Sequence, residues 1–218
     1  MIKALKIAAL SGMFTLAAGV AHAACSIEIA KDDLTDAQAA ELYECIEGKL
    51  LEGYNKSGKA VAGEYRNWFM PSTTPFISAT HGKRFVNHYI NDIGRDAYMS
   101  FNEDDLVMPV GSIAVKESYT INKKGKVRRG PLFVMEKVAA GTFPDTDDWK
   151  YTTIIPNGKI LGETGTDTAK KQKFCHDCHE AVLDGQDAMF FPDEDYRSAS
   201  NRSDRRKKAR LIGRASIL

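Results

Sequence analysis

Cysteine and histidine are scarce in this sequence, which has four cysteines and five histidines among 218 residues. A structural zinc site needs three or four such ligands. Only one Cys-x-x-Cys pair is present, at Cys175 and Cys178, so a structural zinc site is disfavoured. A thioredoxin-like redox pair is also disfavoured, because no β-α-β pattern precedes Cys175.

Long apolar runs are absent after the first 23 residues, and no internal repeat is visible. Residues 1–23 combine Lys3 and Lys6, an apolar stretch and the small-residue site Ala21-His22-Ala23. This pattern is typical of a cleaved signal peptide, and the apolar stretch is short for a membrane anchor. Cys25 raises a lipoprotein alternative, but a histidine stands where a lipobox has leucine. We therefore expect cleavage after Ala23 and export to an oxidising space such as the periplasm.

The sequence has no large net charge, but its charges are unevenly distributed. Residues 197–218 contain eight basic residues and one acidic residue, whereas residues 24–196 contain 20 basic and 28 acidic residues. An acidic body disfavours nucleic-acid binding. The basic tail over 197–218 is predicted to be disordered. Docking of this tail onto an acidic redox partner or anionic lipid is the alternative.

The strongest motif is Cys175-His176-Asp177-Cys178-His179, which reads C-x-x-C-H. This string is the signature of covalent c-type haem attachment. One helical turn places Cys175 and Cys178 on one face, where both thiols can form thioether bonds to haem. His179 is then the proximal iron ligand. The motif predicts one covalently bound haem c.

The rest of the chain predicts an α+β fold, an antiparallel β-sheet meander covered by helices with the haem-attachment helix near the C-terminus. A capping box of Thr35 and Gln38 predicts the start of a helix that ends near Gly58. Helical pattern or strand-like alternation marks the other segments. Helices are predicted over 59–69, 95–101 and 169–183, and strands over 84–91, 109–121, 131–138 and 149–156.

Two domain-level expectations follow from this order. Residues 24–58 form an N-terminal helical extension, and residues 59–196 form the haem domain. Cys25 and Cys45 are the two cysteines outside the motif, and in an exported protein they are expected to form a disulfide. Two unpaired thiols are the alternative, because the sequence does not give their separation.

The order of four sequence segments resembles the cytochrome P-460 family. The segments span about residues 60–195, with a β-rich body before the haem motif. They are Tyr65-Arg66-Asn67-Trp68, the strand GSIAVKE over Gly111–Glu117, Asp147-Asp148-Trp149-Lys150-Tyr151, and Cys175–His179. Small helical cytochromes c differ, because their C-x-x-C-H motif lies near the N-terminus.

The resemblance implies a haem protein that is usually dimeric, with five-coordinate iron and an open distal side. Some members oxidise hydroxylamine, whereas the related cytochromes c′-beta bind nitric oxide or carbon monoxide. Catalytic members carry a lysine cross-linked to the haem, and the matching residue here is Lys116. A solvent-facing lysine is the alternative for this strand position.

The expected function is therefore redox chemistry on a small nitrogen compound such as hydroxylamine. The alternatives are a non-catalytic gas-binding haem protein and a simple electron carrier. The expected partners are a small-molecule ligand or substrate and a redox partner protein, with a homodimer as a further expectation.

Candidates for the distal side of the iron are few. His81 could be an acid–base group or a second ligand, although a loop hydrogen-bonding role is the usual one. Met189 is expected to be a core or haem-edge residue rather than an axial ligand. His88 is interpreted as a sheet residue, and His176 is expected to point away from the iron. With no well-placed distal ligand, the iron is predicted to be five-coordinate.

Charged residues offer further alternatives. Arg66 and Arg84 could contact haem propionates, but surface ion pairs are the favoured interpretation. Glu117 and Glu136 could relay protons, but solvated or salt-bridged positions are favoured for both.

Overall fold

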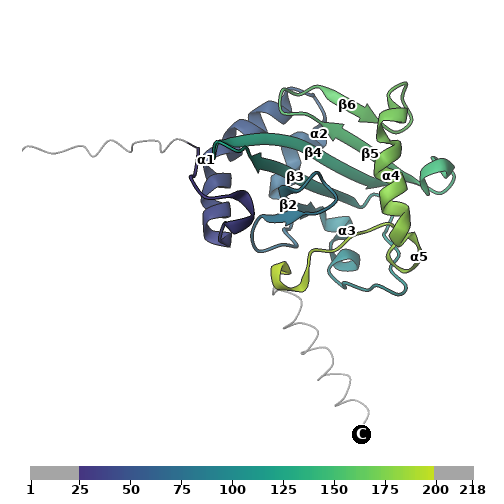
Figure 1. The fold of residues 1–218 in the computed structure, drawn as a ribbon. Helices are drawn as coiled ribbons and strands as arrows, with labels where there is room; N and C mark the ends of the chain where they lie inside the picture. The colour runs from purple at the N-terminus through teal and green to yellow at the C-terminus, as the bar shows by residue number, and fades with distance from the viewer. Residues whose placement is uncertain (1–24, 199–218) are drawn as a thin grey trace, which may run out of the picture.

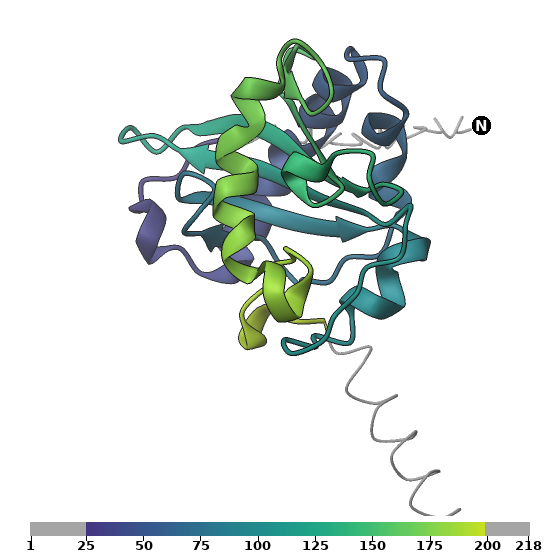
Figure 2. The ribbon, with the colours of Figure 1, turned by 90° about the vertical axis from the view of Figure 1, so that its right-hand side faces the viewer.

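A computed structural model describes residues 25–198 and shows a six-stranded antiparallel sheet with helices on its faces (Figures 1 and 2). The strands follow one another in chain order, as an unbroken meander. They are β1 (Phe76–Ser78), β2 (Arg84–Ile90), β3 (Ile113–Ile121), β4 (Val127–Lys137), β5 (Trp149–Ile154) and β6 (Ile160–Glu163). The predicted α+β meander is confirmed. The predicted signal peptide and residues 199–218 of the basic tail lie outside the described residues.

Helix α1 (Asp36–Asn55) covers one face of the sheet. It begins after Thr35, whose side chain accepts from Gln38 N, so the predicted capping box is confirmed. Its apolar face, including Leu42, Ile46 and Leu50, is buried against the sheet. The predicted disulfide between Cys25 and Cys45 is present and ties the first described residues to this helix.

Shorter helices complete the fold. They are η1 (Lys31–Asp33), α2 (Ala60–Glu64), η2 (Tyr65–Asn67), α3 (Asp92–Tyr98), η3 (Pro144–Thr146), η4 (Ala169–Gln172), α4 (Lys173–His179), η5 (Glu180–Val182), α5 (Leu183–Gln186) and η6 (Glu194–Tyr196). Within residues 25–198, no helix is long and apolar enough to cross a membrane.

Several element boundaries differ from the sequence prediction. The expected strand at 109–121 begins only at Ile113, because the chain turns at Pro109–Ser112 and Ser112 N donates to Pro109 O. The expected strand at 131–138 begins earlier, at Val127. Strands β1 and β6 were not predicted, since three and four residues are too few for a clear alternation.

The register of the sheet decides which side chains share a face. His88, Lys116, Phe133 and Thr153 occupy consecutive cross-strand positions on β2 to β5. Directly paired residues lie on the same side of a sheet. This row faces α4, while the adjacent Glu117 faces α1. The face toward α4 therefore carries His88 and Lys116, whereas Glu117 lies on the face toward α1.

Candidate functional site

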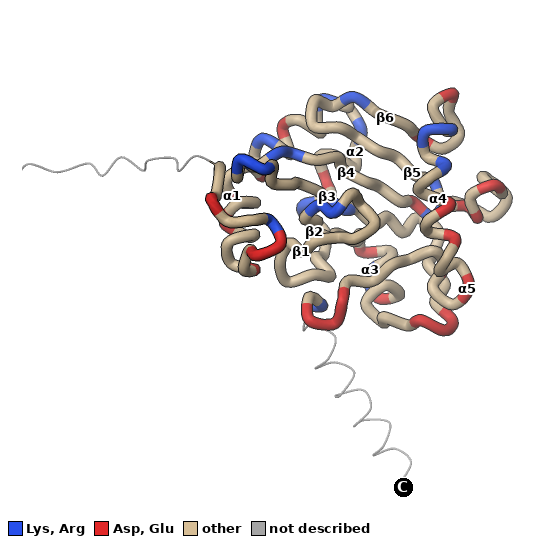
Figure 3. The backbone as a smooth tube through the Cα atoms, in the orientation of Figure 1, with Lys and Arg blue, Asp and Glu red and all other residues tan. Residues whose placement is uncertain are grey.

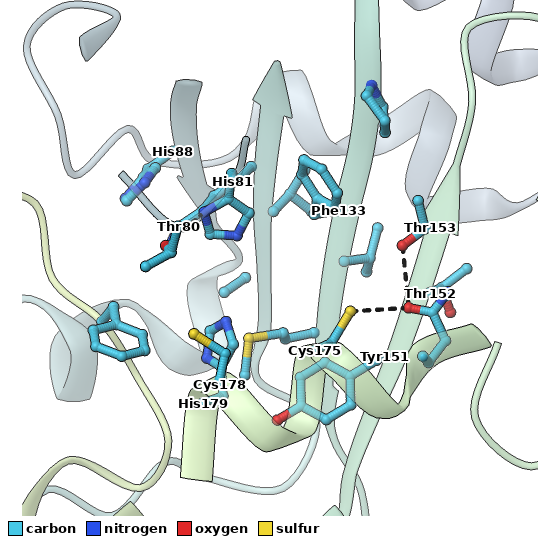
Figure 4. Close-up of a pocket in the computed structure, with 18 of the residues that line it drawn as sticks. Thr80, His81, His88, Phe133, Tyr151, Thr152, Thr153, Cys175, Cys178 and His179 are labelled. Carbon is cyan, nitrogen blue, oxygen red and sulfur yellow. Dashed lines mark hydrogen bonds between the residues drawn. The ribbon is translucent and has the colours of Figure 1, made fainter. Parts of the chain in front are cut away.

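A cavity of ≈ 320 Å³ lies between α4 and the sheet. Its wall includes the two motif cysteines and His179 from α4, Lys116 from β3, Phe133 from β4 and His81 from the β1–β2 loop. Figure 4 shows the labelled members of this set around one space. The fold thus brings together residues that lie about a hundred positions apart in the chain.

The two motif cysteines are unpaired thiols on adjacent turns of α4. Both line the cavity, as a haem anchored by two thioether bonds requires. Burial raises the pKa of Cys175 to about 12, and its thiol donates to Gln172 Oε1 at 3.1 Å. Cys178 is more exposed. In both position and chemical state, the pair fits covalent haem attachment.

His179 is buried and its tautomer is fixed. Its Nδ1 lies 2.7 Å from Ala188 O, and a carbonyl only accepts, so Nδ1 carries the hydrogen. The lone pair is then on Nε2, the state that a metal ligand needs. Burial, together with the nearby Lys116, lowers the pKa of His179 to about 4, which keeps the ring neutral.

Asp187 holds the turn that supplies this carbonyl. Asp187 and Ala188 both have left-handed backbone conformations, with φ of 45° and 62°. The Asp187 carboxylate accepts from Lys137 Nζ at 2.7 Å, Trp149 Nε1 at 3.2 Å and Met108 N at 2.8 Å. Sequence reasoning missed this residue, because its three partners come from distant segments.

Lys116 lies on the cavity face of β3, between His88 and Phe133 in the cross-strand row. Burial lowers its pKa to about 8. No carboxylate among the described residues forms an ion pair with its ammonium group. Lys116 is half-buried and lines the cavity together with the motif residues, so its side chain belongs to the cavity wall rather than to the open surface.

His81 faces the same space. Its ring centre is 6.4 Å from that of His179 and 5.0 Å from that of Phe133. Its Nδ1 is 2.8 Å from Ser78 Oγ and 3.3 Å from Thr80 Oγ1. Burial lowers the pKa of His81 to about 2, and Lys116 adds to the effect. The loop hydrogen bonds predicted for His81 exist, and they hold its ring inside the cavity.

Comparison with known families gives one match. A family model described as cytochrome P-460 matches residues 62–191, more than half of the chain. The chain belongs to the cytochrome P-460 family. Haem is accordingly its cofactor. No curated protein matches the sequence.

The segment matched by the cytochrome P-460 model contains the whole cavity wall described above. Three residues of the cavity wall each have a buried polar atom with no hydrogen-bond partner within residues 25–198: His88 Nε2, Tyr151 OH and Gln172 Nε2. Buried polar atoms are normally paired. Together with the free thiols and the Nε2 lone pair, they fit a large group with polar edges, such as haem. Helix α1 and the disulfide lie outside the matched segment.

The other expected candidates have different places. Met189 is buried in a cluster with Tyr98 and Trp149 and also lines the cavity, as expected of a core or haem-edge residue. His88 is a buried residue of β2, as expected. His176 lies beside Asp147, with Nε2 3.8 Å from its carboxylate.

Arg66 and the two glutamates differ from one another. Arg66 forms an ion pair with Glu117 at 2.5 Å on the α1 side of the sheet. Glu117 is 1% exposed, so the expected surface pair is a buried one, and Arg66 is not positioned to contact a haem in the cavity. Glu136 pairs with Lys150 at 4.0 Å near the surface, as expected. Arg84 contributes to the cavity wall.

Proposed function

We propose that this protein is an exported monohaem c-type cytochrome that carries out redox chemistry on a small nitrogen compound such as hydroxylamine. Cys175 and Cys178 attach the haem, and His179 is the proximal ligand. One observation supports this most strongly: two free thiols and an imidazole with its Nε2 lone pair available line the same cavity. The family match independently supports haem as the cofactor.

Each residue of the cavity has a distinct task in this proposal. Haem, when bound, supplies the iron at which the substrate loses electrons. The carbonyl of Ala188 keeps the proton on His179 Nδ1, so that the ring orientation and tautomer are fixed. Phe133 and Phe190 line the cavity and exclude water. His81 offers a neutral imidazole that can accept a proton from the substrate.

Lys116 favours the catalytic branch of the family over the gas-binding branch. The resemblance assigns a haem-linked lysine to catalytic members, and Lys116 directs a partly neutral amine to the cavity. A neutral amine is nucleophilic. We expect a fraction of the protein to carry a Lys116–haem bond, in which the amine nitrogen replaces a hydrogen of the macrocycle; two protons are released and an external two-electron oxidant, such as a peroxide, accepts the electrons. The apolar part of the wall, with Phe133, Met189 and Phe190, favours the alternative, binding of nitric oxide or carbon monoxide.

Export and partners belong to the same proposal. The disulfide between Cys25 and Cys45 supports an oxidising compartment, in agreement with the signal peptide pattern. Acidic residues of the 139–148 loop and around α5 are drawn in red in Figure 3, on the side of the molecule that carries α4. Such a surface suits a positively charged redox partner protein. The family resemblance also supports a homodimer.

The first test is the mass of the exported protein. Its intact mass should exceed that of the polypeptide by one haem, and acid acetone should leave the haem attached. Cys175→Ala with Cys178→Ala should release it. His176→Gln lies in the same motif but points to Asp147, and it serves as the matched control with haem retained. Haem that is extractable from the unmutated protein overturns covalent attachment.

The second test separates enzyme from gas binder. Peptide mapping of the holoprotein should find the Lys116 peptide joined through haem to the Cys175–His179 peptide, and hydroxylamine should be oxidised. Complete recovery of unmodified Lys116, with no turnover, contradicts the enzyme and favours the gas-binding alternative.

A further inference from the structure

We propose that His81 is a second axial ligand of the haem iron in the resting protein and that an incoming small molecule displaces it. This inference rests on the proposed haem site and adds a gate to it. The two imidazoles reach the cavity from opposite sides: His179 from α4, and His81 from the loop between β1 and β2. Figure 4 shows the two rings facing each other across the space.

The distance between the two ring centres is the main evidence for ligation by both histidines. Their centres are 6.4 Å apart. A metal–imidazole bond is about 2 Å long and the ring centre lies about 1 Å beyond the nitrogen, so two imidazoles on one metal have centres roughly 6 Å apart. A distal histidine that only hydrogen-bonds an iron-bound molecule needs roughly 2 Å more. The observed spacing is that of two ligands on one iron.

The hydrogen bonds of the two rings are matched. His179 Nδ1 donates to Ala188 O at 2.7 Å, and His81 Nδ1 is paired with Ser78 Oγ at 2.8 Å. Each ring is therefore held through Nδ1, and within residues 25–198 neither Nε2 has a hydrogen-bond partner. Metal-binding histidines typically show this arrangement, with the second nitrogen fixed by an outer partner.

The supports of the two rings differ, and this difference makes His81 the replaceable ligand. His179 lies on α4, next to the two cysteines that anchor the haem. His81 lies in a loop where Gly82 and Lys83 both adopt left-handed conformations, with φ of 72° and 50°. Thr80, Gly82 and Lys83 are exposed. Exposed loop segments open at a lower free-energy cost than packed elements.

His88 and Met189 are weaker candidates for the same position. His88 lies within β2. Its ring centre is 5.1 Å from that of Phe76, and its Nδ1 lies 3.4 Å from Tyr98 OH. Met189 belongs to the core beside the Ala188 turn, on the side that supports His179. The sequence predicts five-coordinate iron because it shows no well-placed distal Met or His; ligation by His81, as proposed, would replace that prediction.

Electron paramagnetic resonance and absorption spectra of the ferric holoprotein test the inference. The unmutated protein should be low-spin, and His81→Ala should be high-spin. Carbon monoxide should bind the ferrous His81→Ala protein at least ten times faster than the unmutated protein. Ser78→Ala keeps the ligand but removes its hydrogen bond, so it should stay low-spin and bind carbon monoxide a few times faster. His176→Gln is the control and should match the unmutated protein.

Two outcomes overturn the inference: a wholly high-spin ferric spectrum of the unmutated protein, or a low-spin spectrum that persists in His81→Ala. Should His81→Ala fail to fold with haem, His81→Gln preserves a polar side chain of similar size and decides the same question. Either failure leaves covalent haem in place, as the intact mass shows. Loss of the proposed haem site itself appears instead as a protein without attached haem.

Discussion

Lys116 and Glu117 are neighbours on β3, yet they belong to opposite faces of the sheet with opposite chemistry. Glu117 is 1% exposed and is surrounded by donors: Arg66 at 2.5 Å, Tyr43 at 2.5 Å and Tyr65 at 2.8 Å. Lys116 has no comparable partner within residues 25–198. A buried charge with a complete set of partners is part of the scaffold. A half-buried amine on the cavity wall without such partners is available to a molecule that the chain does not encode.

The tyrosines repeat this contrast. On the α1 face, Tyr54 OH donates to Gly130 O and Tyr119 OH donates to Ala39 O, each at 2.6 Å. On the cavity face, Tyr151 OH and His88 Nε2 are buried without partners among the described residues. The α1 face stabilises the fold through contacts that are already complete. The cavity face keeps its polar groups for function.

The largest expected loss of stability comes from removing the Glu117 carboxylate on the α1 face. Glu117→Ala leaves the Arg66 guanidinium largely buried without its carboxylate, and removal of one partner of a buried pair costs about 3–5 kcal/mol. Urea denaturation measures the loss of unfolding free energy. Arg66→Met together with Glu117→Leu is the control, and it should recover much of the loss. A loss below about 1 kcal/mol for the single variant contradicts a scaffold role.

The next largest loss of stability is expected from removing the disulfide on the α1 side of the sheet. Replacing Cys25 and Cys45 by serine removes a cross-link with a sequence separation of 20 and should cost about 3 kcal/mol. The measurement is the urea midpoint, compared with that of the oxidised unmutated protein; the reduced unmutated protein is the control and should match the variant. Because the cross-link lies on the α1 side, the haem absorption spectrum should be unchanged. A shifted spectrum would mean that the two faces are coupled.

Local signals in the sequence were sufficient for much of the fold. The Thr35–Gln38 capping box fixed the start of α1, and alternation found the four longer strands. The C-x-x-C-H string predicted a helix at the motif, and α4 is present there. These features depend on residues close together in the chain, where side-chain periodicity is informative.

The features that the sequence did not predict depend on contacts between residues far apart in the chain. Asp187 acquires its role from Lys137, Trp149 and Met108, none of which is near it in sequence. The approach of His81 to His179 spans 98 positions and follows from the sheet register and the β1–β2 loop. Alternation alone also left the orientation of Lys116 open, since its partners Ala114 and Ser118 suit either face.

A smaller loss of stability is expected from weakening the turn at Asp187 that supports His179. Asp187→Asn weakens the charge-assisted bond to Lys137 and should cost about 2 kcal/mol. A structural role alone does not move the haem, so the iron–histidine stretching frequency and the reduction potential are measured as well. Both should change, because the Ala188 carbonyl then holds His179 less firmly. Asp184→Asn, an exposed neighbour in the same turn region, should leave stability and both haem properties unchanged.

Lys116→Met should cause the smallest loss of stability, and it tests the comparison with Glu117 directly. Burial lowers the pKa of Lys116 from 10.5 to about 8, so the folded chain binds this proton less tightly than the unfolded chain does. Between pH 8 and 10.5 the unfolded state holds more protons, and the stability of the unmutated chain should rise with pH across that window. Methionine removes the titrating group and with it this rise in stability with pH.

Below pH 8 the Lys116→Met chain should be at least as stable as the unmutated chain, and any gain in unfolding free energy should shrink as the pH approaches 10.5. Urea denaturation of the chain before haem attachment measures this difference, and the exposed Lys123→Met is the matched control with no pH-dependent difference. A loss of more than about 1 kcal/mol at pH 7 would show that Lys116, like Glu117, belongs to the scaffold.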